Sequence, residues 1–147
     1  VVAIIQARMG SVRFPGKMLA NLHGYPVLEW VLHRVAQATE VDEVVLATTD
    51  MARDNPLVEL AGRLAVPVHR GSESDVLGRF ADAAAAFDAE GVVRICADNP
   101  FIDPAEIDWN QSGEGTAPED WSEGLELAAT LDPPSLYEDQ LARRLGR

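Results

Sequence analysis

Short apolar runs and amphipathic stretches alternate along the first two thirds of the chain. Four of the runs have the length and composition of buried strands, which we predict at 1–6, 43–48, 66–69 and 92–96. Between them, apolar residues recur at the spacing of one helical face. This spacing predicts helices over 27–38, 55–64 and 72–87, and the Asp-Pro pair at 103–104 predicts the start of another short helix.

Polar residues and glycine indicate where these helices begin and end. Asn55 followed by Pro56 predicts a helix with Asn at the N-cap and proline at the first helical position. Ser72, with Asp75 three residues later, resembles a capping box. Gly91 is expected to stop the helix that this box begins.

Strands that alternate with helices indicate an α/β fold. Right-handed crossovers place helices on both faces of a mostly parallel sheet, for which we predict the strand order 3-2-1-4. Ligands of such sheets bind beyond the carboxyl ends of the strands. The loop after the first strand and Asp98, which follows the fourth strand, should therefore flank one crevice.

The alternating pattern ends after Asp108. Residues 109–124 are rich in Gly, Ser and acidic residues without a clear period, which is typical of a linker. Over 135–146, Ser135 and Glu138 have capping-box spacing and predict a short helix. We therefore divide the chain into an α/β core, 1–108, and an atypical linker with a short C-terminal helix, 109–147.

Composition excludes several classes of protein. A net charge of -12 argues against a general nucleic-acid binder, and no apolar run approaches the ~20 residues of a membrane span. Cys96 is the only cysteine, so an internal disulfide is excluded and a zinc site built on cysteines is not expected. We predict that Cys96 is buried in its strand. These features fit a cytoplasmic protein.

Against this acidic background, the loop after the first strand is basic. It carries Arg8, Arg13 and Lys17, with Gly10 and Gly16 between them, and no acidic residue precedes position 29. Glycines let a backbone approach phosphate oxygens, which Arg and Lys can neutralise, so a nucleoside triphosphate is a candidate ligand. A basic surface loop with glycine turns explains the same spacing equally well.

Three segments together resemble the cytidylyltransferases that activate acidic sugars: IIQARMGSVRFPGKML, EVVLATTD and VVRICADNPFIDP. The resemblance covers 1–108 and is greatest to the spore-coat polysaccharide biosynthesis branch, beside the 3-deoxy-manno-octulosonate and acylneuraminate enzymes. It implies a Rossmann-like nucleotidyltransferase fold that transfers CMP from CTP to a sugar for cell-surface or spore-coat polysaccharides. It also implies Mg²⁺ as cofactor and a homodimer contact.

The resemblance assigns roles to particular residues. The loop that wraps the triphosphate corresponds to Ala7, Arg8, Met9, Gly10 and Ser11, and the cations that balance the leaving pyrophosphate correspond to Arg13 and Lys17. The metal-binding aspartate corresponds to Asp98. The segment against base and ribose corresponds to Gly71, Ser72, Asp75 and Arg79. The implied catalytic residues are Arg8, Lys17 and Asp98, with the sugar hydroxyl as nucleophile.

Two matters stay open at this stage. Asp98 before Asn99-Pro100 also suits a simple turn, and Asp103 suits a helix cap better than a metal ligand. Relatives in the family continue past the point that matches Asp108, with parts of the sugar pocket and a second metal-binding aspartate. We therefore expect a truncated member, which acts either as an enzyme or as a catalytically impaired nucleotide-binding remnant or interaction module.

Overall fold

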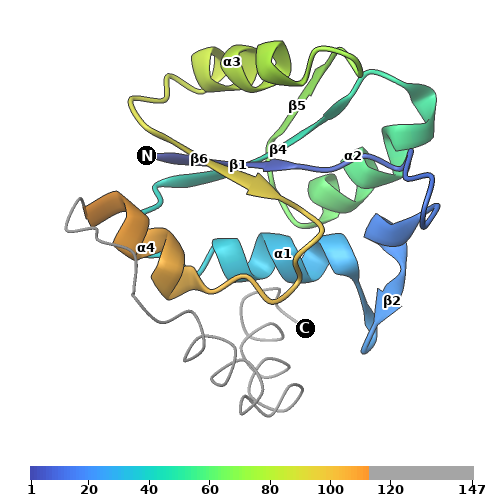
Figure 1. Cartoon of the computed structure of the whole chain (residues 1–147), viewed down its shortest axis with the longest axis horizontal. Coiled ribbons are helices and arrows are strands. Elements are labelled where there is room, and N and C mark those ends of the chain that lie inside the picture. Colours follow the sequence, from blue (N-terminus) through green and yellow to red (C-terminus); the bar gives the residue numbers. More distant parts are fainter. Residues whose placement is uncertain (113–147) are drawn as a thin grey trace.

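The computed structural model of the chain describes residues 1–112, in which four parallel strands form one sheet. The strands are β1 (Val2–Gln6), β4 (Glu43–Thr49), β5 (Val68–Gly71) and β6 (Val92–Cys96). They lie in the order β5-β4-β1-β6, which is 3-2-1-4 when the four are numbered along the chain, as predicted. All their carboxyl ends point to one edge of the sheet, on the right in Figure 1.

Helices cover both faces of this sheet, as expected for an α/β fold (Figure 1). One face carries α1 (Val27–Val35), α2 (Asn55–Arg63) and α4 (Pro104–Ser112), and the other carries α3 (Val76–Ala86). No helix within 1–112 is long and apolar enough to cross a membrane. The predicted helix over 135–146 and most of the predicted linker lie outside the described residues.

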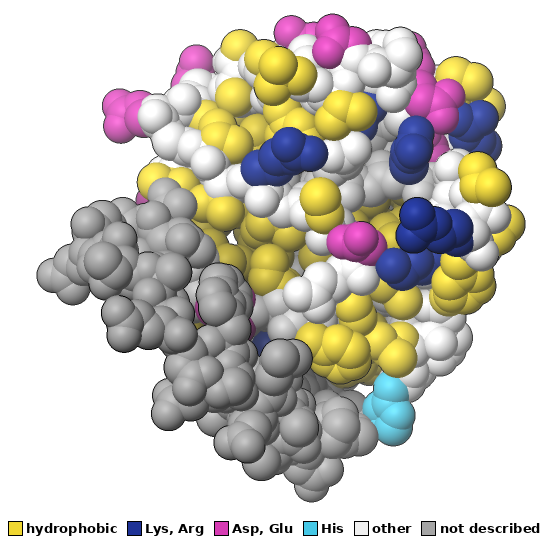
Figure 2. All heavy atoms as spheres, viewed as in Figure 1, with side chains coloured by type: hydrophobic (Ala, Val, Ile, Leu, Met, Phe, Trp, Pro, Cys, Tyr) yellow, Lys and Arg dark blue, Asp and Glu magenta, His cyan; other side chains and the backbone are white. Residues whose placement is uncertain are grey.

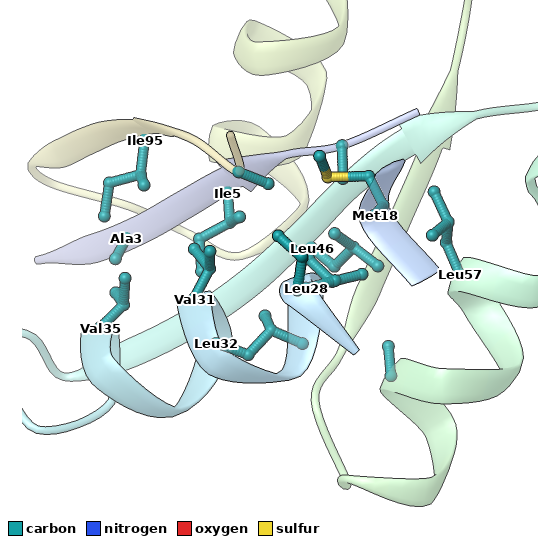
Figure 3. Close-up of a cluster of buried hydrophobic side chains, with 14 of the residues drawn as sticks. Ala3, Ile5, Met18, Leu28, Val31, Leu32, Val35, Leu46, Leu57 and Ile95 are labelled. Carbon is teal, nitrogen blue, oxygen red and sulfur yellow. The ribbon is translucent and has the colours of Figure 1, made fainter. Parts of the chain in front are cut away.

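The central strand, β1, is buried on both sides. Ile5 is fully buried and faces Val31 of α1 (Figure 3). Ile4 turns to the opposite face, where it packs with Phe80 and Ala83 of α3. Because both faces of β1 are covered, the strand fixes the point from which the basic loop leaves the sheet.

A small hairpin was not predicted. It consists of β2 (Asn21–Leu22) and β3 (Tyr25–Pro26), and it follows a short 3-10 turn, η1 (Lys17–Leu19). Its two turn residues, His23 and Gly24, have φ values of 52° and 93°, the left-handed geometry of a tight hairpin turn. The hairpin packs beside α1 through a hydrogen bond from Trp30 Nε1 to the carbonyl oxygen of Leu22, at 2.6 Å.

Two predicted N-caps are wrong, the first by one residue and the second by three. The N-cap of α2 is Asp54, the last residue of the 3-10 turn η2 (Ala52–Asp54), and Asn55 is already helical. The N-cap of α3 is Asp75, whose Oδ1 accepts a hydrogen bond from Gly78 N at 2.8 Å. Ser72 instead accepts a hydrogen bond from the N–H of Asp75 at 3.2 Å, so it shapes the turn before the helix.

Two further corrections concern Gly91 and Cys96. α3 ends at Ala86, before Gly91, and the chain turns at Asp88, which has a φ of 47°. Cys96 is exposed, where burial was predicted. β6 is an edge strand of the described sheet, and only alternate side chains, among them Ile95, face the main core. Cys96 points to the opposite face, where it stays exposed at the edge of the sheet.

Candidate functional site

The basic loop leaves the carboxyl end of β1 along a defined path. Ala7 N donates to Ala47 O at 3.2 Å, which extends the pairing of β1 with β4 beyond the strand. Ser11 N donates to Met9 O at 2.8 Å and folds the loop back on itself. Gly16 has a φ of 72°, a conformation that side chains disfavour, and it leads directly into η1. The loop is therefore a folded feature at the carboxyl ends of the strands.

The buried carboxylate of Asp54 accepts a hydrogen bond from the backbone of this loop. Asp54 is fully buried, and its Oδ1 accepts a hydrogen bond from the backbone N–H of Met9 at 2.7 Å. Its Oδ2 accepts a hydrogen bond from the hydroxyl of Thr49, at the end of β4. Asp54 thus ties the loop after β1 to the end of the neighbouring strand. Sequence reasoning missed this residue, although an acidic residue shortly after TTD, at the end of a buried strand, was an available signal.

Three loops meet around one carboxylate, Glu73, which lies between β5 and α3. Its Oε1 lies 3.7 Å from Nη1 of Arg8 and also pairs with Nη2 of Arg53. Arg53 lies in η2, and its guanidinium lies against Gly10, where an added Cβ would come within 3.3 Å of Nε. The loops after β1, β4 and β5 therefore bring two arginines together.

Many of the Lys and Arg side chains visible in Figure 2 lie on the right-hand side, the side toward which the strands' carboxyl ends point in Figure 1. Basic groups therefore gather where an α/β sheet binds its ligands.

The structure brings Lys17 and Asp98 together. Lys17 Nζ donates to the backbone carbonyl of Asp98 at 3.3 Å, across the gap between the loops after β1 and β6. The side chain of Asn99, and not that of Asp98, supports the next turn, because its Oδ1 accepts from Phe101 N at 3.0 Å. Within 1–112 the carboxylate of Asp98 makes no hydrogen bond or ion pair, which leaves its oxygens available to a ligand. Asp103 accepts from Ala105 N at 2.9 Å and is a helix-start residue.

A magnesium ion fits this arrangement only as part of a nucleotide complex. No group of three His, Cys, Asp or Glu side chains within the described part of the chain could hold a metal ion. Mg²⁺ is commonly held by one or two carboxylates together with substrate phosphates and waters. The free carboxylate of Asp98, a residue whose backbone carbonyl accepts a hydrogen bond from Lys17 Nζ, is compatible with that mode of binding.

The segment expected to face base and ribose surrounds a buried arginine. Arg79 is 1% exposed, and its Nη1 donates to Ser72 O at 2.5 Å. Its Nε and Nη2 have no hydrogen-bond partner among the described residues. Burial lowers the pKa of Arg79, and the charge of Arg8 lowers it further. An added Cβ at Gly71 would lie 3.2 Å from the Arg79 side chain, so Gly71 makes room for it.

Ser11, Asp75 and Arg13 are the remaining predicted site residues, and each has a different setting. Ser11 is in place at the loop, where its hydroxyl accepts from Phe14 N at 3.2 Å. Asp75 uses one carboxylate oxygen as the N-cap of α3, which leaves less of it for a ligand. Arg13 is exposed and has no ion pair or hydrogen bond within 1–112, so the structure does not bring it to the other cations.

Comparisons with known proteins agree on one family. Residues 2–114 match the family model described as cytidylyltransferase. The chain is similar to the spore coat polysaccharide biosynthesis protein SpsF of Bacillus subtilis, with 39% identity over 112 residues, covering 74% of this chain and 47% of that protein. The chain spans less than half the length of the curated relatives it matches.

Solved structures give the same result. A cytidylyltransferase from Leptospira borgpetersenii superposes with a TM-score of 0.70 at 36% identity, covering 74% of this chain and 46% of that one. A CMP:2-keto-3-deoxy-manno-octonic acid synthetase complexed with CTP superposes with a TM-score of 0.64 at 26% identity, covering 76% of this chain and 46% of that one.

Proposed function

The chain belongs to the cytidylyltransferase family, and we propose that it binds CTP at the basic loop and transfers CMP to a sugar hydroxyl with release of pyrophosphate. The contact between Lys17 Nζ and the carbonyl of Asp98, at 3.3 Å, carries this proposal. It joins the loop after β1 to the loop after β6, at the carboxyl ends of the strands, where α/β sheets bind ligands.

The proposed roles follow from charge and position. The sugar hydroxyl attacks the α-phosphorus of CTP, and the bond from that phosphorus to the oxygen bridging it to the β-phosphate breaks. Arg8 and Lys17 neutralise the charge that develops on the leaving pyrophosphate, while the backbone of 7–11 approaches the phosphate oxygens. Arg13 is proposed to join them from its exposed position once a nucleotide is bound. No nucleophilic side chain is needed, because the acceptor supplies the hydroxyl.

Base and ribose are proposed to lie against the segment from Gly71 to Arg79. Arg79 has two buried nitrogens without a partner within 1–112, and such donors are costly unless a ligand or water accepts from them. Gly71 and Ser72 give this segment its close approach to Arg79. Asp75 contributes chiefly by starting α3.

We propose Asp98 as the protein ligand of Mg²⁺. When bound, Mg²⁺ would withdraw charge from the phosphates. The free carboxylate of Asp98 supports this role, as does the position of Lys17 on the backbone of the same residue, which leaves the side chain unoccupied. The proposed acceptor is a sugar destined for cell-surface or spore-coat polysaccharide, in the cytoplasm, where CTP is supplied. A homodimer stays a prediction.

A steady-state assay tests this function. The 147-residue chain is supplied with CTP, Mg²⁺ and a panel of acidic and neutral sugars, and released pyrophosphate is measured. We expect release that depends on both CTP and one class of sugar. Binding of CTP without release for any sugar would support the alternative, a nucleotide-binding module without turnover. Failure to bind CTP would contradict both.

A further inference from the structure

The geometry points to Arg53 as a further phosphate-binding side chain, one that completes the cationic site around the basic loop. This inference rests on the proposed function of that loop. Arg53 lies in η2, 43 positions along the chain from Gly10, and neither its spacing nor any motif connects it to Arg8 or Lys17.

The first support is the contact with Gly10. The guanidinium of Arg53 lies so close to the loop backbone that a Cβ at position 10 would be 3.3 Å from Nε and 3.4 Å from Nη2. The missing side chain at Gly10 is therefore what allows Arg53 to reach the backbone expected to face the phosphates. A guanidinium beside such a backbone offers two parallel donors to a phosphate.

The second support is the shared partner. Glu73 pairs with both Arg53 and Arg8, so the two guanidinium groups converge on one carboxylate. Two cations and one carboxylate leave a net positive charge, to which Lys17 adds from the other side of the loop. Arg53 and Arg8 are 44% and 48% exposed at the side chain, so both are accessible to an anion.

The third support is the rigidity of the platform. Asp54, the next residue, is fully buried and hydrogen-bonded to Met9 N at 2.7 Å. This bond fixes the backbone of η2 against the loop, so Arg53 is held at the loop before any ligand arrives. A cation positioned in advance loses less entropy on binding.

The experiment measures binding of inorganic tripolyphosphate to the full chain by calorimetry at low ionic strength. This probe has the phosphates but no base, sugar or metal requirement. Arg53→Gln should weaken binding about tenfold, since a charged hydrogen bond is lost. Arg53→Lys keeps the stem and charge but not the two parallel donors, and should weaken binding roughly threefold. Arg63→Gln, at the far end of α2, is the matched control and should bind as the unmodified chain does.

Two results would overturn the inference. One is tripolyphosphate affinity in Arg53→Gln and Arg53→Lys equal to that of the Arg63→Gln control. The other is no binding of tripolyphosphate by the unmodified chain. Thermal melting of each variant verifies that the fold is kept. If Arg53→Gln melts at a lower temperature than the control, the tripolyphosphate affinity of Arg53→Lys is compared with that of the control instead. A chain that binds tripolyphosphate through Arg53 but does not bind CTP would support the inference while refuting the proposed function.

Discussion

The carboxylate of Asp54 accepts a hydrogen bond at 2.7 Å from the backbone N–H of Met9, which lies 45 positions earlier in the chain. The same carboxylate accepts from the hydroxyl of Thr49, and the side chain is fully buried. A loop that follows one strand is thus held by a residue that follows its neighbour. The shape of the basic loop therefore depends on a side chain outside it.

Replacing Asp54 tests this dependence. Asp54→Ala leaves the Met9 N–H and the Thr49 hydroxyl without their acceptor, so we expect a loss of about 2 kcal/mol in the free energy of unfolding. Nucleotide binding should also weaken, because the loop loses its support. Urea unfolding and CTP titration measure the two effects. Asp82→Ala, on the exposed face of α3, should change neither, and an Asp54→Ala chain as stable as this control would refute the role.

Lys17 is the only lysine in the chain, so chemical modification of a lysine side chain reports on this residue alone. Lys17→Ala should weaken CTP binding roughly tenfold with little change in melting temperature, since the side chain is partly exposed and its one hydrogen bond is to a carbonyl. Reductive methylation of the unmodified chain gives a second measurement: CTP should slow modification of Lys17. Equal rates with and without CTP would contradict a place for this amine at the phosphates.

Asp98 is tested through the effect of Mg²⁺ on affinity. Mg²⁺ should strengthen CTP binding less in Asp98→Asn than in the unmodified chain, because the neutral amide is a poorer ligand. In the presence of Mg²⁺ the variant should bind CTP roughly tenfold more weakly. Without Mg²⁺ the variant should bind CTP at least as well as the unmodified chain, since a repelling charge is gone. An unchanged response to Mg²⁺, as expected for the control Asp82→Asn, would exclude Asp98 as the ligand.

Asp108 gives a prediction for pH. Its carboxylate accepts from Thr39 N at 3.0 Å, from Thr39 Oγ1 at 3.0 Å and from Glu40 N at 2.8 Å. The backbone hydrogen bonds to Thr39 and Glu40 lower the pKa of Asp108. A carboxyl whose pKa is lower in the folded state stabilises the fold above its ordinary, unfolded pKa, and this stabilisation is lost as the pH falls through the lowered value.

The matching experiment compares the unmodified chain with Asp108→Asn. At neutral pH the unmodified chain should be the more stable in urea, and the difference should shrink as the pH falls below the ordinary carboxyl range, about pH 4. A stability difference that stays constant from neutral to acidic pH would contradict the prediction, because it would show that protonation of Asp108 does not affect stability.

The order of the strands in the sheet could be predicted from the sequence. Periods of two and 3.6 residues are local properties, and parallel strands with right-handed crossovers leave few arrangements to choose from. The meeting of Lys17 with Asp98 follows from that arrangement, since β1 and β6 are neighbours. Asp98 also proved free of the turn that could have used its side chain, because Asn99 supports that turn.

Contacts between loops that are far apart in the sequence could not be predicted from sequence patterns. The bond from Met9 to Asp54 and the pairing of Arg8 with Glu73 join segments with no fixed spacing, and each depends on the exact path of a loop. The Asn-Pro pair at 55–56 predicted the N-cap of the second helix at Asn55, one residue after the actual N-cap, Asp54. Cys96 was misplaced because an apolar strand was taken to be covered on both faces, which does not hold for an edge strand.

The bond between Asp54 and the basic loop uses only the main chain of position 9. Any amino acid with a backbone N–H can therefore occupy that position without losing the bond, and proline alone is excluded by chemistry. Position 54, by contrast, needs a short side chain with two acceptor oxygens. Tolerance should thus be unequal at the two ends of one hydrogen bond: at Met9 it is limited by the packing of the side chain against the core, and at Asp54 by the bond itself. A saturation library over both codons would display that inequality directly.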